Sequence, residues 1–325
     1  MFDPGMDRRS FLTLGAGALA VALAPPLLRA RERLVRRTFP MMGTVGEIAI
    51  PARHEASTRV AVNAAIGELQ RVEHLMSRFR ADSDIGRVNA AAPGQAVPVS
   101  PETAEVIRDA LAWAEETGGV FDPCLARLSE LWDPTQVDAP PAEVDLAPYR
   151  SQSLWRAVEV DGDPTAPRVR RHRAVAALDL GGIAKGYGVD RAVAVLNGFG
   201  VTRGLVNLGG DLMALGVAEG GHPWRIGVRD PLRPDQVIAT LEGVDAAIAT
   251  SGDYLRYFEY GGRRYHHLLD PVTGSPRTAS MHTVTVRASS VCTADAAATA
   301  AFGVSPAPDS YRPFLRSDVR IVHRG

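Results

Sequence analysis

The 325-residue chain has few cysteines and almost no excess of charge. Cys124 and Cys292 are its only cysteines, which excludes a fold supported by several disulfides, so a hydrophobic core must hold it. Its 36 basic and 37 acidic residues give a formal net charge of -1, which excludes a global field that would attract nucleic acid or an anionic membrane surface. Any anionic ligand must therefore be held by a local site.

Long hydrophobic runs are also scarce. The run near the N-terminal end, residues 14–24, is too short to predict a membrane span and is followed by Pro25-Pro26. It comes after Arg8-Arg9, and this order resembles a twin-arginine export signal. We therefore expect residues 1–30 to be a signal segment and the protein to be exported, to the periplasm or facing the cell envelope. Cleavage of the segment and its retention as an anchor both stay open.

The chain as a whole has 46% hydrophobic and 22% charged residues, a composition typical of a globular protein with a large core. Apolar spacing and turn residues predict strands and helices in mixed order, without regular βαβ spacing or a repeat. We therefore expect one α+β domain over residues 36–325, with residues 133–150 as a surface excursion. The expected strands are Thr44–Pro51, Val175–Leu180, Leu205–Leu208, His282–Ala288 and a hairpin of Tyr254–Tyr260 with Arg263–Leu269; the expected helices are Glu55–Met76, Pro101–Thr117, Ile183–Leu196 and a stretch around Asp295–Phe302.

A carboxylate, two glycines and a lysine meet at an expected strand-to-helix junction, in the segment Asp179–Tyr187. Free amides at a helix N-terminus attract anions, and glycine lets a phosphate approach the backbone. The segment has neither the Walker A order nor the Rossmann spacing of glycines. By itself it is therefore open between a phosphate site and a structural turn.

Asp295 and Thr299 are four residues apart on an expected helix, so both oxygens project from one face. Mg²⁺ prefers oxygen ligands and keeps water, which makes this pair a plausible arm of a magnesium site. The alternative is structural, with an aspartate near a helix start and a threonine bonded back to its own helix. His266 and His267 are adjacent in an expected strand, so only one of them can face a site.

Taken together, these segments resemble one family from about residue 38 to residue 303, the ApbE family of FAD:protein FMN transferases. Eight of its motifs occur in order. They are Met42-Gly43-Thr44, Met76-Ser77-Arg78-Phe79 with Asn89, Gly119–Pro123, Asp179–Tyr187, Asn207–Asp211, Thr250–Tyr254, His267–Gly274 and Ala294–Thr299.

The resemblance implies Mg²⁺-dependent transfer of the FMN half of FAD to a threonine or serine hydroxyl of an acceptor electron-transfer flavoprotein, with release of AMP. It implies magnesium ligands at Asp295, Thr299 and the carbonyl of Gly182. It implies an FAD site lined by Met42, Phe79, Val120, Phe121, Asp122, Asp179, Lys185 and His267. A hydroxyl needs a neighbouring base near neutral pH, and His267 occupies the family's histidine position, so we expect His267 to be that base.

Two other functions stay open. A Mg²⁺-dependent pyrophosphatase that splits FAD into FMN and AMP would use the same site with water as the nucleophile, and acceptor-dependent flavin incorporation would separate the two. An FAD-binding carrier would retain FAD tightly without releasing AMP. Membrane contact is expected only through the signal segment or the acceptor. Cys124 and Cys292 flank the expected site, and a disulfide between them after export stays open.

Overall fold

The computed structural model describes residues 19–21, 34–52, 55–233, 235–254, 256–278, 281–304 and 316–324. The expected export signal, with Arg8-Arg9, lies outside these residues except for Leu19–Val21, which form the short strand β1. No helix within the described ranges has the length and apolar character needed to cross a membrane.

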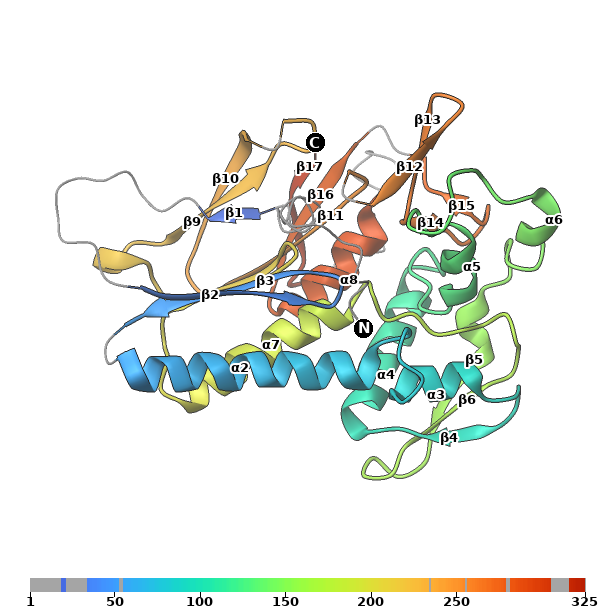
Figure 1. The fold of residues 1–325 in the computed structure, drawn as a ribbon, viewed down its shortest axis with the longest axis horizontal. Coiled ribbons are helices and arrows are strands. Elements are labelled where there is room, and N and C mark those ends of the chain that lie inside the picture. Colours follow the sequence, from blue (N-terminus) through green and yellow to red (C-terminus); the bar gives the residue numbers. More distant parts are fainter. Residues whose placement is uncertain are drawn as a thin grey trace.

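A seven-stranded antiparallel sheet forms the centre of the molecule, in the order β17-β16-β11-β8-β7-β3-β2 (Figure 1). Four small sheets surround it, with the orders β1-β9-β10, β4-β6-β5, β12-β13 and β14-β15. The strands of the large sheet are β2 (Leu34–Met41), β3 (Thr44–Pro51), β7 (Gly204–Leu208), β8 (Asp211–Leu215), β11 (Ala246–Gly252), β16 (Thr283–Ala288) and β17 (Arg320–Arg324); the others are β4 (Ala96–Pro98), β5 (Val158–Asp161), β6 (Arg168–Arg171), β9 (Trp224–Arg229), β10 (Val237–Gly243), β12 (Tyr257–Tyr260), β13 (Arg263–His266), β14 (Leu269–Asp270) and β15 (Ser275–Pro276).

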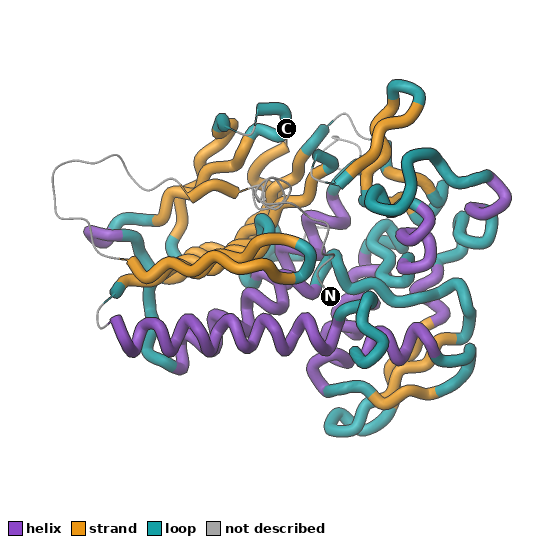
Figure 2. Tube along the Cα trace, in the orientation of Figure 1, coloured by secondary structure: helices purple, strands orange, loops and turns teal. Residues whose placement is uncertain are grey.

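Three helices lie along one face of the large sheet (Figure 2), namely α2 (Glu55–Met76), α7 (Ala184–Gly198) and α8 (Val291–Ala301). Apolar side chains of α2 and α7 pack against β2, β3 and β7 in one buried cluster. At Gly186 the helices α7 and α8 approach so closely that an added Cβ would lie 2.3 Å from the carbonyl oxygen of Val291. Glycine is therefore required where these two helices cross.

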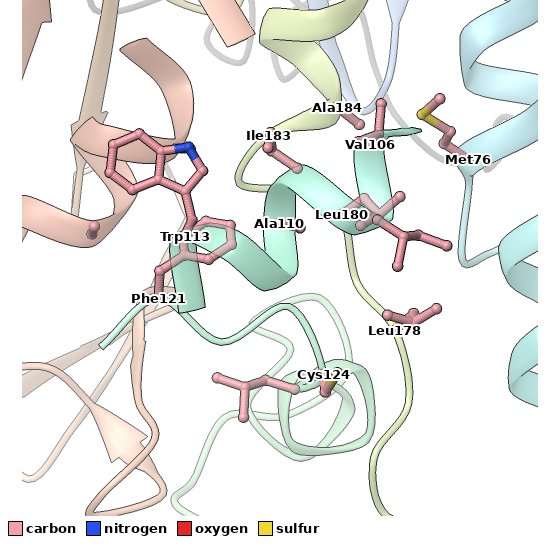
Figure 3. Close-up of a cluster of buried hydrophobic side chains, with 14 of the residues drawn as sticks. Met76, Val106, Ala110, Trp113, Phe121, Cys124, Leu178, Leu180, Ile183 and Ala184 are labelled. Carbon is pink, nitrogen blue, oxygen red and sulfur yellow. The ribbon is translucent and has the colours of Figure 1, made fainter. Parts of the chain in front are cut away.

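The remaining helices gather around a second hydrophobic core, shown in part in Figure 3. They are α3 (Asp84–Ala90), α4 (Pro101–Glu116), α5 (Ala126–Leu131) and α6 (Glu143–Leu146), with a short 3-10 helix at Leu154–Ala157. A second 3-10 helix, Glu219–Gly221, follows β8, is exposed and does not belong to this core. Ser100 caps α4 by accepting from the amide of Thr103 at 3.2 Å, and Pro101 occupies the first helical turn. This core extends to α8, so it connects the second group of helices to the large sheet.

The mixed α+β architecture agrees with the sequence prediction, but the strand predicted over Val175–Leu180 is wrong. This segment makes only an isolated bridge between Ala177 and Leu125. Asn89 takes the place of a neighbouring strand, because its side chain donates to the carbonyl of Leu178 at 2.8 Å and accepts the amide of Leu178 at 2.7 Å. The segment is therefore extended and buried, but its backbone partners are a side chain and a loop.

Candidate functional site

Three charged side chains meet beside the glycine turn that leads into α7. Nζ of Lys185 lies 2.7 Å from Oδ2 of Asp211 and 3.2 Å from both carboxylate oxygens of Asp295. It also donates to the carbonyl of Gly181 at 3.2 Å. Both aspartates are only 2% exposed, whereas Lys185 is half-buried. We call Lys185, Asp211 and Asp295 the ionic cluster; it joins α7, β8 and α8.

The ionic cluster contains two carboxyl groups and one ammonium group. Burial and the neighbouring Asp295 carboxylate raise the pKa of Asp211, against the opposing effect of Lys185. Burial by itself would lower the pKa of Lys185, but Asp211 and Asp295 together outweigh it and raise that pKa, so the ammonium stays charged. Oδ2 of Asp211 has no hydrogen bond of acceptable geometry although Nζ is close to it. Two acids sharing one ammonium suit a further cation.

The three residues predicted to bind magnesium lie at the ionic cluster. Thr299 follows Asp295 by one turn of α8, and an added Cβ on Gly182 would lie 3.1 Å from Oγ1 of Thr299. A carboxylate, a hydroxyl and a backbone carbonyl are oxygen donors of the kind that Mg²⁺ prefers. Within the described ranges no three His, Cys, Asp or Glu side chains are grouped so as to hold a metal. The donors and the excess negative charge therefore fit a magnesium ion that relies partly on neutral oxygens.

The glycine turn itself is accessible. Gly181 is exposed and Gly182 is half-buried, and α7 begins without a side-chain cap. Amides in the first turn of a helix lack intrahelical partners and attract anions. The amide of Gly186 already donates to Oδ2 of Asp295 at 3.1 Å. The amide of Gly181 donates to Oδ1 of Asp179, and those of Ile183 and Ala184 donate to the carbonyl of Leu180, so the segment stays open between a phosphate site and a structural turn.

Met42 lies in the tight turn between β2 and β3. Met42 and Gly43 both have positive φ angles, 48° and 67°, and for a methionine this conformation costs about 1–2 kcal/mol. Two neighbours anchor the turn: the amide of Met42 donates to Glu73 of α2 at 2.8 Å, and Nη2 of Arg256 donates to the carbonyl of Gly43 at 2.5 Å.

Arg256 also connects this turn to His267. The carbonyl of Arg256 lies 3.3 Å from the backbone amide of His267 and 3.4 Å from its Nδ1. A proton on Nδ1 would leave Nε2 free to accept one. The ring is accessible to solvent but surrounded by protein, and this desolvation, followed by the charge of Arg256, lowers the pKa of His267; Lys185 acts in the same direction. His267 is therefore neutral at pH 7 and a weaker base than an ordinary imidazole, and it lies within electrostatic reach of Lys185.

Asp179 and Phe79 lie on the other side of the glycine turn and are joined through Arg78. Nε of Arg78 lies 3.0 Å from Oδ2 of Asp179, whose Oδ1 accepts the amide of Gly181 at 2.9 Å. The guanidinium of Arg78 lies 4.2 Å from the centre of the Phe79 ring, and Phe79 is 77% exposed. An exposed ring held here offers a stacking surface to a flavin or adenine ring.

The other predicted FAD residues, Val120, Phe121 and Asp122, form a loop with contacts of its own. Phe121 is buried in the second core, as Figure 3 shows, and its ring would lie 3.2 Å from an added Cβ on Gly182. The carboxylate of Asp122 accepts the amides of Cys124 and Trp155 at 2.9 and 3.3 Å. Burial raises the pKa of Asp122 to about 6 despite these hydrogen bonds. The ring of Phe121 thus brings this loop next to Gly182, one of the predicted magnesium ligands.

A cavity of about 490 Å³ borders the same loop at Val120. Its lining includes none of the three residues of the ionic cluster and no other residue predicted to contact FAD. The chemistry therefore points to the ionic cluster and not to this cavity. The lining residues are Gly118–Val120, Arg263, Asp270–Thr273, Ser275–Thr278 and Phe302–Val304.

Several residues of the site escaped the sequence prediction. Asp211 is the last residue of the motif Asn207–Asp211, so the sequence marks it as part of the family pattern. Its pairing with Lys185 was not predictable, because it depends on the approach of β8 to α7. Arg78 lies within a motif as well. Arg256 and Glu73 carry no signal of their own, because each acts through a contact with a residue more than thirty positions away.

The fold and this site agree with one protein family. The ApbE family model matches residues 42–312. The chain is 35% identical over 294 residues to a FAD:protein FMN transferase of Treponema pallidum, covering 84% of this chain and 80% of that protein. It is 32% identical over 288 residues to one of Vibrio cholerae, covering 86% and 85%. The chain therefore belongs to the ApbE family.

Solved structures agree with this assignment. The ApbE protein of Thermotoga maritima superposes with a TM-score of 0.80 at 33% identity, over 89% of this chain and 94% of that one. The flavin transferase ApbE of Vibrio cholerae gives 0.74 at 30% identity, over 83% and 86%. The α+β fold described above is therefore that of the family.

Proposed function

We propose that this protein is an FAD:protein FMN transferase, which moves the FMN half of FAD onto a threonine or serine hydroxyl of an acceptor flavoprotein and releases AMP. The observation that carries the proposal is the ionic cluster of Lys185, Asp211 and Asp295 beside an accessible glycine turn. In a member of the ApbE family, this is the arrangement that a pyrophosphate and a cation require.

The chain's own residues would divide the work as follows. The glycine turn and Lys185 bind the pyrophosphate, while the exposed ring of Phe79 offers a surface to the flavin or the adenine. Nε2 of His267 accepts the proton of the acceptor hydroxyl as its oxygen attacks the FMN-side phosphorus. A new P–O bond to the acceptor forms, the bond from that phosphorus to the bridging oxygen breaks, and AMP leaves with the bridging oxygen.

Gly182, Asp295 and Thr299 would hold Mg²⁺, which when bound supplies positive charge to the pyrophosphate and the departing AMP. Positioning and charge stabilisation dominate transfers of this kind. The redox chemistry of the flavin is not used, so the protein needs no electron donor or acceptor for this reaction.

The test is to incubate the protein with FAD, Mg²⁺ and candidate acceptor proteins and to examine the acceptors by mass spectrometry. Transfer predicts an FMN adduct on a hydroxyl residue together with free AMP. FMN and AMP without an adduct, with every acceptor, would instead assign the protein as an FAD pyrophosphatase. Retained FAD without AMP would assign it as a carrier.

The proposal includes the place of action. The Arg8-Arg9 pair and the short apolar run after it support export by the twin-arginine route to the periplasm or the cell-envelope face, where an acceptor electron-transfer flavoprotein would be met. This route carries folded proteins, so FAD could be bound before export.

A further inference from the structure

Asp211 holds the lysine of the ionic cluster more closely than Asp295 does. Nζ of Lys185 is 2.7 Å from Asp211 and 3.2 Å from Asp295. Asp211 is the first residue of β8, paired across the hairpin with Leu208 of β7, and it is buried. Its backbone is therefore held in the central sheet, whereas Lys185 has a long, flexible side chain.

Asp295 is both an ion-pair partner of Lys185 and a proposed ligand of magnesium. Both of its oxygens face the Lys185 ammonium, and Oδ2 also accepts the amide of Gly186. A magnesium ion held by Asp295 would lie near the ammonium, because both oxygens of Asp295 are within 3.2 Å of Nζ. Two positive charges so close repel each other. Lys185 must therefore withdraw from Asp295 when the metal binds, yet a buried ammonium without a partner is costly.

We propose that Asp211 is a positioning residue for this exchange: it keeps the Lys185 ammonium paired while Mg²⁺ takes over Asp295. Lysine and metal then share the ionic cluster instead of competing for one carboxylate. Without Asp211, the ion pairs described for Lys185 leave it Asp295 alone, and it competes with the metal directly. The inference rests on the magnesium site of the proposed function and adds a residue to it.

The test measures Mn²⁺ binding to the full chain without FAD or acceptor, by electron paramagnetic resonance of the free ion. Mn²⁺ accepts the same oxygen ligands as Mg²⁺. Asp211→Asn should weaken binding by about 10- to 100-fold, as removal of a partner around a metal site does. Lys185→Met in the Asp211→Asn background should restore most of the lost affinity, because the competing ammonium is gone. Asp163→Asn, the same substitution at an exposed acid bonded to Thr165, should leave the affinity unchanged.

Two results would overturn the inference. The first is wild-type affinity in Asp211→Asn. The second is a double variant that binds as weakly as Asp211→Asn, which would make Asp211 a direct metal ligand or a structural residue. Lys185→Met alone keeps the test valid if Asp211→Asn does not fold: it should bind Mn²⁺ more tightly than wild type, and weaker binding contradicts the exchange. Absence of Mn²⁺ binding by the wild type, or wild-type affinity in Asp295→Asn, would refute the magnesium site itself, whereas the FMN adduct assay tests the transferase separately.

Discussion

At the scale of single residues, two adjacent histidines have opposite environments. His266 is buried, with its Nδ1 accepting the amide of Leu268 at 3.2 Å and its Nε2 lying 2.9 Å from the carbonyl of Arg277. His267 lies one residue beyond the end of β13 (Arg263–His266) and is exposed to solvent. The strand predicted through both histidines therefore ends at His266, and the opposite exposure of the two rings comes from the bend that follows, not from strand alternation.

His267→Ala should slow FMN transfer by about 10²- to 10⁴-fold, the usual contribution of a general base, while FAD binding persists. The measurement is the transfer rate to an acceptor together with FAD affinity. His172→Ala, at an exposed histidine paired with Glu159, is the matched control and should keep the wild-type rate. Because the pKa of His267 is lowered, the wild-type rate should not fall as pH drops through 6.5. A wild-type rate in His267→Ala would refute the assignment.

The loop acid Asp122 should make stability depend on pH. Its pKa is raised from 3.8 to about 6 by burial, so the stability it contributes is present below pH 3.8 and is lost as pH rises through about 6. Asp122→Asn cannot ionise. As pH rises from 4 to 7, the difference in free energy of unfolding between this variant and wild type should therefore shift in favour of the variant by about 1–3 kcal/mol.

Urea unfolding at several pH values measures this difference. The control is Asp163→Asn, because the hydrogen bond from Thr165 lowers the pKa of Asp163, and this variant should not gain on wild type as pH rises. A difference between Asp122→Asn and wild type that is independent of pH would contradict the raised pKa.

At the scale of elements, Arg277 connects the C-terminal end of α8 to the loop at Val120 and to β14. It is half-buried, and burial lowers its pKa to about 10. Its guanidinium donates to five backbone carbonyls in the described structure, those of Val120, Leu269, Thr299, Ala300 and Phe302. A single side chain thus satisfies the last carbonyls of the helix that carries Asp295 and Thr299.

Arg277→Ala should destabilise the protein by about 3 kcal/mol or more, because several carbonyls lose their donor. Arg277→Lys keeps the charge but has fewer hydrogen-bond donors, so its free energy of unfolding should lie between those of wild type and Arg277→Ala. The free energy of urea unfolding is the measurement, and Arg127→Ala, at an exposed arginine near Glu130, should change it by less than about 0.5 kcal/mol. Equal effects of Arg277→Ala and Arg127→Ala would show that the carbonyl network contributes nothing.

Elements with strong local signals were predictable from the sequence, and those that depend on distant partners were not. The helix Glu55–Met76 and the strand Thr44–Pro51 have the predicted bounds. The helix predicted around Asp295–Phe302 begins earlier, at Val291, because Ser290 caps it by accepting the amide of Thr293 at 3.1 Å. Asp190 of α7 adds a distant contribution by accepting the amides of Val291 and Cys292 at 3.0 and 2.9 Å. The pairing of Lys185 with Asp211 likewise exists only once α7 and β8 are packed together.

At the scale of the whole molecule, family membership rests on most of the chain, since the family model spans residues 42–312. The eight motifs are far apart in sequence, yet the fold brings α7, β8, α8 and the turn between β2 and β3 to one site. The expected export signal, residues 1–30, precedes the residues that the family model matches. We therefore expect export and catalysis to be separable.

Replacing Arg8-Arg9 with Lys-Lys should keep the protein in the cytoplasm, because the twin-arginine receptor reads the pair and not only its charge. Cell fractionation measures the distribution. The retained protein should still transfer FMN in extracts, since residues 8 and 9 precede the residues 42–312 that the family model matches. Unchanged delivery to the periplasm would point to the general secretory route.

The most direct test of the central claim is the reaction of FAD, Mg²⁺ and an acceptor protein in water enriched in ¹⁸O, with mass spectrometry of both products. Transfer to a hydroxyl predicts an FMN adduct on the acceptor without ¹⁸O and one unlabelled AMP for each adduct, because the acceptor oxygen forms the new bond and AMP keeps the bridging oxygen. Free FMN or AMP carrying ¹⁸O, with no adduct, would show that water is the nucleophile and would contradict the transferase.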